Sequence, residues 1–97
     1  MTNLYALADQ VTDEASFTKF VAALAEDWED ERRKEAAAPS SPWGAGANGW
    51  ENGTIGDFLA TAAAWAESSR HGLPRYAPPD NPWRRCADIL LAGKIIE

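Results

Sequence analysis

Few residues of this chain could do chemistry: one histidine, one cysteine and one cluster of acids. His71 lies beside Gly72, and a lone histidine serves as a general base only with a nucleophile and an orienting group nearby. The sequence has no Gly-x-Ser-x-Gly turn, no His-Glu-x-x-His pattern and no second histidine. Cys86 stands alone, so an intramolecular disulfide is excluded. The sequence therefore predicts a non-enzymatic protein, with no catalytic residue, no cofactor and no metal.

The densest charge feature is the acidic run at 26–31 of a predicted helix, which three basic residues follow. Like charges four residues apart on a helix repel slightly, whereas Glu29–Arg33 and Asp30–Lys34 are favourable pairs. A straight helix cannot wrap six or more oxygens around Ca²⁺. Two interpretations stay open, a solvated helix face and a docking patch for a basic partner. The candidate partner-binding acids are Glu26, Asp27, Asp30 and Glu31.

Five tryptophans in 97 residues are the second unusual feature. Trp28 and Trp65 fall on predicted apolar helix faces, so we expect both in the core. Trp43 and Trp50 lie in a loop at 39–53 that contains two prolines and four glycines. An indole in such a loop either anchors the loop or serves an interface, where tryptophan is enriched. Both interpretations stay open, and Trp43 and Trp50 join the acids as candidate partner-binding residues.

The elements that must position these residues are helices. Apolar residues recur at helical spacing between proline- and glycine-rich joints, which predicts an all-α small helical bundle. Its three main helices are expected at about 14–38, 55–69 and 82–93. A short N-terminal helix or extended segment at 3–11 precedes them. The predicted N-caps are Asp13, Thr54 and Asn81. A second, Pro-rich loop lies at 72–81, and the whole chain, 1–97, is expected to be a single domain.

Each predicted helix carries one apolar stripe that should face the core. The stripes consist of Phe17, Phe20, Val21, Leu24 and Trp28; of Ile55, Phe58, Leu59, Ala62, Trp65 and Ala66; and of Trp83, Cys86, Ala87, Leu90 and Leu91. On its stripe, Cys86 is expected to be a small buried hydrophobe. Gly93 is expected to end the last helix. We expect one or both loop indoles to pin the 39–53 loop to the body.

The net charge of −6 limits the classes of partner that are expected. Nucleic acid is not expected, because neutralising phosphates requires clustered lysine and arginine. The charge fits either attraction to a basic protein or good solubility. No apolar run approaches the roughly 20 residues that cross a bilayer, and no signal-peptide pattern is present, so no membrane partner is expected. A single cysteine makes the reducing cytoplasm the default compartment.

At Trp50-Glu51-Asn52-Gly53-Thr54-Ile55 the chain resembles a family of small, uncharacterised bacterial domains. The likeness continues through Ser16-Phe17 with Phe20, Leu24 and Asp27, Phe58-Leu59, Ala64-Trp65, Asn81-Pro82-Trp83 and the run 87–97. In that family the position of Ile96 is more often tyrosine, and the loop from Ala36 to Asn48 is longer and richer in glycine here. The resemblance implies no established activity. By analogy, small acidic bacterial domains of this kind suggest immunity proteins of toxin–antitoxin or contact-dependent competition systems.

Three functions are compatible with these sequence features. The first is a non-enzymatic protein-binding domain, most concretely an immunity-type inhibitor of a basic toxin or enzyme. The acids at 26–31 would steer the encounter, and Trp43 or Trp50 would be the buried anchor. The second is a self-associating structural or assembly subunit, a homo-oligomer with no external target. The third is an enzyme acting through His71, Glu51 or Glu67.

Overall fold

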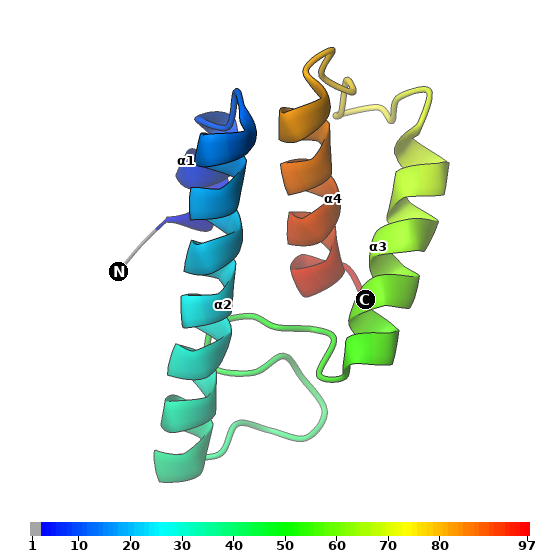
Figure 1. The fold of residues 1–97 in the computed structure, drawn as a ribbon. Helices are drawn as coiled ribbons and strands as arrows, with labels where there is room; N and C mark the ends of the chain where they lie inside the picture. Colours follow the sequence, from blue (N-terminus) through cyan, green and yellow to red (C-terminus); the bar gives the residue numbers. More distant parts are fainter. Residues whose placement is uncertain (1–2) are drawn as a thin grey trace.

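The computed structural model describes residues 3–97, and within this range it contains four α-helices and no strand (Figure 1). They are α1 (Leu4–Asp9), α2 (Glu14–Ala37), α3 (Ile55–Ser69) and α4 (Pro82–Ile95). The all-α prediction is confirmed, and the N-terminal segment takes its helical alternative. None of the helices in residues 3–97 has both the length and the apolar character of a bilayer span.

The helices begin at the residues that the sequence marks as caps. The Asp13 carboxylate accepts the Ser16 backbone N–H at 2.8 Å, and the Ser16 hydroxyl accepts the Asp13 N–H in return. The hydrogen bond from the Ser16 backbone N–H, and then that from the Ser16 hydroxyl to the same carboxylate at 2.7 Å, lower the pKa of Asp13. Thr54 caps α3 through the Asp57 N–H, and Asn81 caps α4 with a proline at the first helical position. Side-chain oxygens thus satisfy N–H groups that have no partner within a helix.

Helix α4 lies between α2 and α3, which each pack against α4 rather than against one another (Figure 1). The short α1 packs against both α2 and α4. The core lies where α1, α2 and α4 meet, and two residues outside the helices, Val11 and Trp50, complete it. Its buried members are Leu4, Ala8, Val11, Phe20, Leu24, Trp50, Ala87 and Leu91.

The core differs from the predicted one in which indole it buries. Trp28 is partly buried and packs against this core, whereas Trp65 is partly buried but is not a core residue, so the expectation of a core around both indoles is wrong for Trp65. Phe20 and the loop residue Trp50 occupy the interior instead. The long α2 reaches beyond the other helices, and the returning loop covers the part of α2 that carries Trp28 (Figure 1).

Several stripe residues also face outward, against expectation. Ile55 is 81% exposed and Leu59 is 57% exposed. The reason is that α3 has α4 as its sole helical neighbour among the described helices, so only one side of α3 is covered. Val21 and Cys86 are exposed as well, so the expectation that Cys86 is buried is wrong.

Gly93 does not end α4, because the helix continues to Ile95. A Cβ at Gly93 would lie 2.8 Å from Cε1 of Phe58, which is too close for any side chain. The glycine is therefore a packing residue that lets α3 approach α4, and the helix ends two residues later.

Candidate functional site

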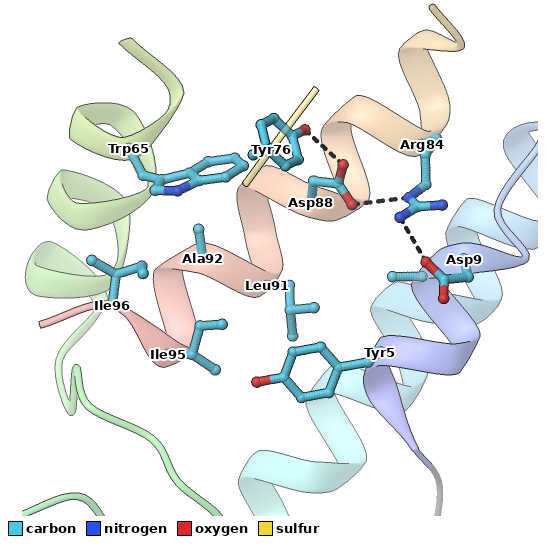
Figure 2. Close-up of a pocket in the computed structure, with 11 residues that line it drawn as sticks. Tyr5, Asp9, Trp65, Tyr76, Arg84, Asp88, Leu91, Ala92, Ile95 and Ile96 are labelled. Carbon is cyan, nitrogen blue, oxygen red and sulfur yellow. Dashed lines mark hydrogen bonds and ion pairs between the residues drawn. The ribbon is translucent and has the colours of Figure 1, made fainter. Parts of the chain in front are cut away.

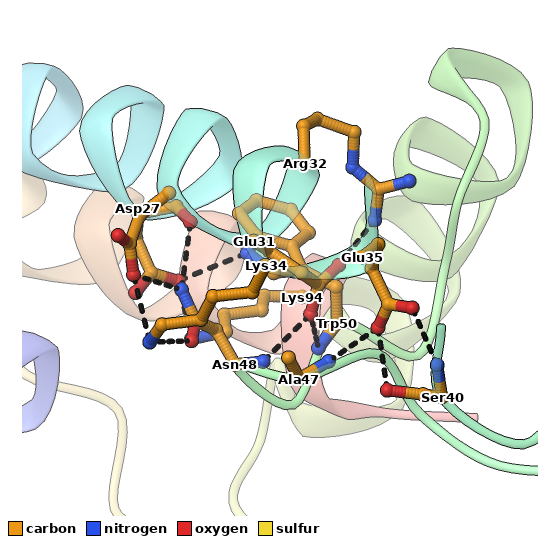
Figure 3. A network of polar contacts seen from close by, with 11 residues as sticks. Asp27, Glu31, Arg32, Lys34, Glu35, Ser40, Ala47, Asn48, Trp50 and Lys94 are labelled. Atoms are coloured by element: carbon orange, nitrogen blue, oxygen red, sulfur yellow. Dashed lines mark hydrogen bonds and ion pairs between the residues drawn. The ribbon is translucent and has the colours of Figure 1, made fainter. Parts of the chain in front are cut away.

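Three carboxylates of α2 join this helix to the loop that follows it (Figure 3). Asp27, Glu31 and Glu35 are spaced four residues apart, so they lie on one face of the helix, one turn above the other. All three accept hydrogen bonds from loop residues. The loop therefore packs against this face of α2.

Glu31 is the central carboxylate and is completely buried. Its Oε1 accepts the backbone N–H of Asn48 at 2.8 Å and that of Trp50 at 3.3 Å. Its Oε2 pairs with the guanidinium of Arg32. A Cβ at Gly46 would overlap this carboxylate, so only glycine fits where the loop passes Glu31.

Asp27 connects α2 to the loop and to α4. Its Oδ2 accepts the indole N–H of Trp50 at 2.9 Å and the ammonium of Lys94 at 2.7 Å. The Trp50 ring, 9% exposed, packs edge-on against Trp28 with centroids 5.1 Å apart and lies 5.9 Å from the Phe58 ring. Trp50 is thus the indole that pins the loop to the body, as one of the two interpretations proposed.

Asn48 supplies the side chain that completes this network. Its Nδ2 donates to the backbone oxygen of Asp27 and to Oδ2 of Asp30, both at 3.0 Å, and its Oδ1 accepts Lys34 Nζ at 2.8 Å. The hydrogen bond from Lys34 and then that from Asn48 lower the pKa of Asp30 to about 2. The carboxylate of Asp30 therefore carries its charge at neutral pH inside a local set of partners.

Glu35 binds both ends of the segment 40–47. One of its oxygens accepts the backbone N–H of Ser40 at 2.7 Å, and the other accepts that of Ala47 at 2.8 Å. The Ser40 hydroxyl donates to it too, and the hydrogen bonds from Ser40, side chain first, lower the pKa of Glu35. At the tip of this segment, Trp43 is 93% exposed.

The candidate partner-binding residues of the sequence therefore separate into two groups. Asp27, Glu31 and Trp50 are occupied within the fold, so the expectation that they form part of an open docking patch is wrong for these three. Burial removes Glu31 and Trp50 from the surface, and hydrogen bonds to the loop and α4 occupy Asp27. Glu26 is exposed, Asp30 is partly exposed and Trp43 projects from the surface.

Glu35, Asn48 and Lys94 belong to this site but are not among the residues predicted from the sequence. For Glu35 the sequence does hold a signal, because Asp27, Glu31 and Glu35 form an i, i+4, i+8 series that points one row of carboxylates in one direction. Such a row beside a glycine-rich loop with many free backbone N–H groups indicates a loop-binding face.

The motif around Asn52 is structural. The Asn52 amide donates to the backbone oxygens of Gly93 and Ile96, both at 2.8 Å, and accepts the Thr61 hydroxyl. The Glu51 N–H donates to the Lys94 carbonyl at 2.8 Å. These contacts satisfy carbonyl groups at the end of α4, which have no partner inside the helix, and tie them to the start of α3.

A second polar cluster lines a hollow of about 260 Å³ between α1, α3 and α4 (Figure 2). Arg84 bridges Asp9 at 2.7 Å and Asp88 at 2.9 Å, and the Tyr76 hydroxyl donates to Asp88 at 2.7 Å. Burial, followed by the hydrogen bond to Asp88, raises the pKa of Tyr76. Burial alone would lower the pKa of Arg84, but Asp88 and Asp9 outweigh it and leave that pKa raised.

The polar side chains of this cluster form hydrogen bonds or ion pairs with one another and with their neighbours. In the described part of the chain, no buried side-chain nitrogen or oxygen lacks a hydrogen-bond partner. Arg85 donates to Ser69 and to the Ala66 carbonyl, with its guanidinium over the Trp65 ring at 5.2 Å. The cluster thus fastens α3 and the 70–81 connection to α4, and we assign it a structural role.

The third region is an apolar groove of about 410 Å³ between α2 and α3. Its lining contains no ionisable side chain and consists of Trp28, Trp50, Asn52, Gly53, Thr54, Ile55 and Phe58. Leu59, one turn after Ile55, extends the apolar surface along α3.

The remaining reactive side chains lie on the surface. His71 and Cys86 are both exposed. Across residues 3–97, no group of three or more His, Cys, Asp or Glu side chains is arranged to hold a metal ion. The surface also carries two apolar features, the exposed indole of Trp43 and the groove between α2 and α3.

The chain belongs to a family of unknown function, DUF7660, whose model matches residues 13–97. The expected membership of an uncharacterised domain family is thereby confirmed. Comparisons with curated proteins and with solved structures gave no match.

Proposed function

We propose that this chain is a non-enzymatic protein-binding domain that inserts Trp43 into an apolar pocket of its partner. The observation that carries the proposal is the 93% exposure of this indole on a segment whose two ends are fixed to one carboxylate. A fully exposed tryptophan contributes nothing to its own core, whereas tryptophan is enriched among residues that dominate binding energy.

The three hydrogen bonds from Ser40 and Ala47 to Glu35 support this proposal, because they order the segment 40–47 before a partner binds. Ser40 and Ala47 flank the exposed tip and bind the same carboxylate. At the tip, Ser41 Oγ accepts the Trp43 N–H at 3.2 Å and the Ser41 carbonyl accepts the Gly44 N–H at 3.3 Å. A segment that is already ordered loses less conformational entropy when a partner binds.

The partner in this proposal is a basic protein, and the specific form is an immunity-type inhibitor of a bacterial toxin or enzyme in the cytoplasm. The net charge of −6 supports a basic partner. On the exposed side of α2, Glu26 and Glu29 have no ion-pair partner among residues 3–97. Exposed charges of this kind accelerate association with an oppositely charged protein.

The test begins with capture of the partner from the native host on the immobilised chain. Its dissociation constant is then measured for the wild type, Trp43→Ala and the control Tyr5→Ala, which removes an exposed aromatic of α1. Trp43→Ala should weaken binding by about 30-fold or more, as loss of a binding hot spot does, and the control should not. Equal dissociation constants for wild type and Trp43→Ala would overturn the proposed anchor.

Charge steering is tested on the same pair by measuring the association rate between low and high salt. We expect Glu26→Lys with Glu29→Lys to slow association by about tenfold at low salt and to flatten its salt dependence. An association rate that changes neither with salt concentration nor with these substitutions would rule out a basic partner. It would not affect the proposed role of Trp43.

A further inference from the structure

The outer side of α3 is an exposed apolar ridge. Ile55 and Leu59 are 81% and 57% exposed, and the residues that continue this side of the helix are Ala63 and Ala66. At spacings of four, four and three residues, these positions lie on one face. These four ridge residues are uncharged, although the chain has a net charge of −6.

The ridge borders the α2–α3 groove, because Ile55 belongs to both. A protruding apolar ridge and an apolar hollow therefore lie next to one another on the same surface of the chain. Contiguous exposed apolar surface of this kind is typical of an interaction site. Neither α1 nor α2 packs on α3, so this side of the helix has no cover within the described chain.

We propose that a second copy of this chain covers this surface in a two-fold symmetric dimer, with α3 antiparallel to α3 of the partner. A two-fold interface must be self-complementary, with the same patch on both subunits. The α3 ridge meets this condition in its own sequence, because large side chains occupy its first half and small ones its second half. Antiparallel pairing places Ile55 opposite Ala66 of the other copy, and Leu59 opposite Ala63.

The charge distribution limits which surface a second copy can use. Two chains of net charge −6 repel, and this repulsion is smallest where the facing surfaces carry no acids. The groove lining and the four ridge residues carry no acid, so a second copy can approach there against the least repulsion. This inference is independent of the proposed role of Trp43, which lies outside the groove lining.

Sedimentation velocity of the purified chain from about 1 to 500 µM tests the dimer. The wild type should sediment as a species of twice the 10.5 kDa chain mass at the upper concentrations. Leu59→Glu should raise the dimer dissociation constant at least about tenfold. Leu73→Glu, at an exposed position in the 70–81 connection, and Trp43→Ala are the controls that should leave it unchanged.

A size exchange tests the antiparallel register. Ala63→Leu alone should weaken the dimer, because it would oppose two leucines across the interface. Adding Leu59→Ala should restore the dimer, because it again sets one large residue against one small residue. Circular dichroism of each variant checks the helical content.

A wild type that remains monomeric up to the highest concentration overturns the proposal, and the apolar surface then belongs to an interface with a different protein. A dimer that survives Leu59→Glu overturns it as well, because such a dimer uses another surface. Failure of the size exchange to restore pairing rejects the antiparallel register.

Discussion

Trp43 and Trp50 lie seven residues apart in the same glycine-rich loop, yet one is 93% exposed and the other 9%. Loop composition therefore does not decide whether an indole is buried. The partners on α2 decide it: Asp27 accepts the indole N–H of Trp50, whereas Glu35 binds backbone groups on either side of the segment that carries Trp43.

One loop therefore serves two purposes. The part from 46 to 53 is bound to the helices through Glu31, Asp27 and the end of α4. The part from 40 to 47 is bound only at its base, so its tip stays in solvent. Asp27 and Glu31 thus hold Trp50 in the interior. Glu35, in the same row of carboxylates, holds the ends of the segment that leaves Trp43 in solvent.

Alanine substitutions at the two indoles should differ most in their effect on stability. Trp50→Ala should lower the free energy of unfolding by about 3–5 kcal/mol, because it removes a buried ring from the core. Trp43→Ala should change it by less than about 0.5 kcal/mol, as surface substitutions do. Urea denaturation followed by circular dichroism measures both, and similar losses for the two variants would contradict the contrast.

The next effect compares two acids of the 26–31 run. Glu31→Ala should lower the free energy of unfolding by about 1–3 kcal/mol, because the backbone N–H groups of Asn48 and Trp50 lose their buried acceptor. Glu26→Ala, at an exposed position, should be nearly neutral. If both variants unfold at the wild-type urea concentration, Glu31 is not the anchor of the loop.

Two glycines test where the loop is pinned. Gly46→Ala should lower the free energy of unfolding by about 1–3 kcal/mol, because its Cβ would overlap the Glu31 carboxylate and force neighbours to move. A Cβ at Gly44 would meet nothing within 4 Å, so Gly44→Ala is the matched control. Equal melting temperatures for the two variants would argue against tight packing at Gly46.

The smallest effect concerns pH. A carboxyl with a lowered pKa in the folded state stabilises the fold above its unfolded pKa, and this stability is lost as the pH falls through the folded pKa. For Asp30 that range runs from 3.8 down to about 2, and for Glu35 it begins below 4.5. Thermal unfolding should therefore show declining stability below about pH 4.5, and Asp30→Asn should show a shallower decline. An unchanged profile in that variant would remove Asp30 from the acid response.

The helices were predictable because their signals are local. The caps at Asp13, Thr54 and Asn81 and the apolar spacing mark the helices within a few residues of their observed ends. The short α1 remained ambiguous, since a six-residue helix depends on packing against α2 and α4 more than on its own sequence.

The site was less predictable because it depends on tertiary neighbours. Periodicity shows that Ile55 and Leu59 share an apolar side of α3, but it cannot show that no helix covers that side. The acidic run likewise looks like a solvated face until the loop returns to it. That return brings Lys94 to Asp27 across 67 residues, a pairing that no local pattern reports.

This long separation has a consequence for synthesis on the ribosome. Asp27 and Trp50 emerge well before Lys94, the cation that pairs with Asp27 and lies 5.6 Å from the Trp50 ring. Contacts between distant parts of a chain form only after the entropy cost of closing the intervening stretch is met. The nascent chain can therefore form the contacts of Lys94 with Asp27 and the Trp50 ring only after α4 has been translated and has docked, so a later helix completes the packing of an earlier loop.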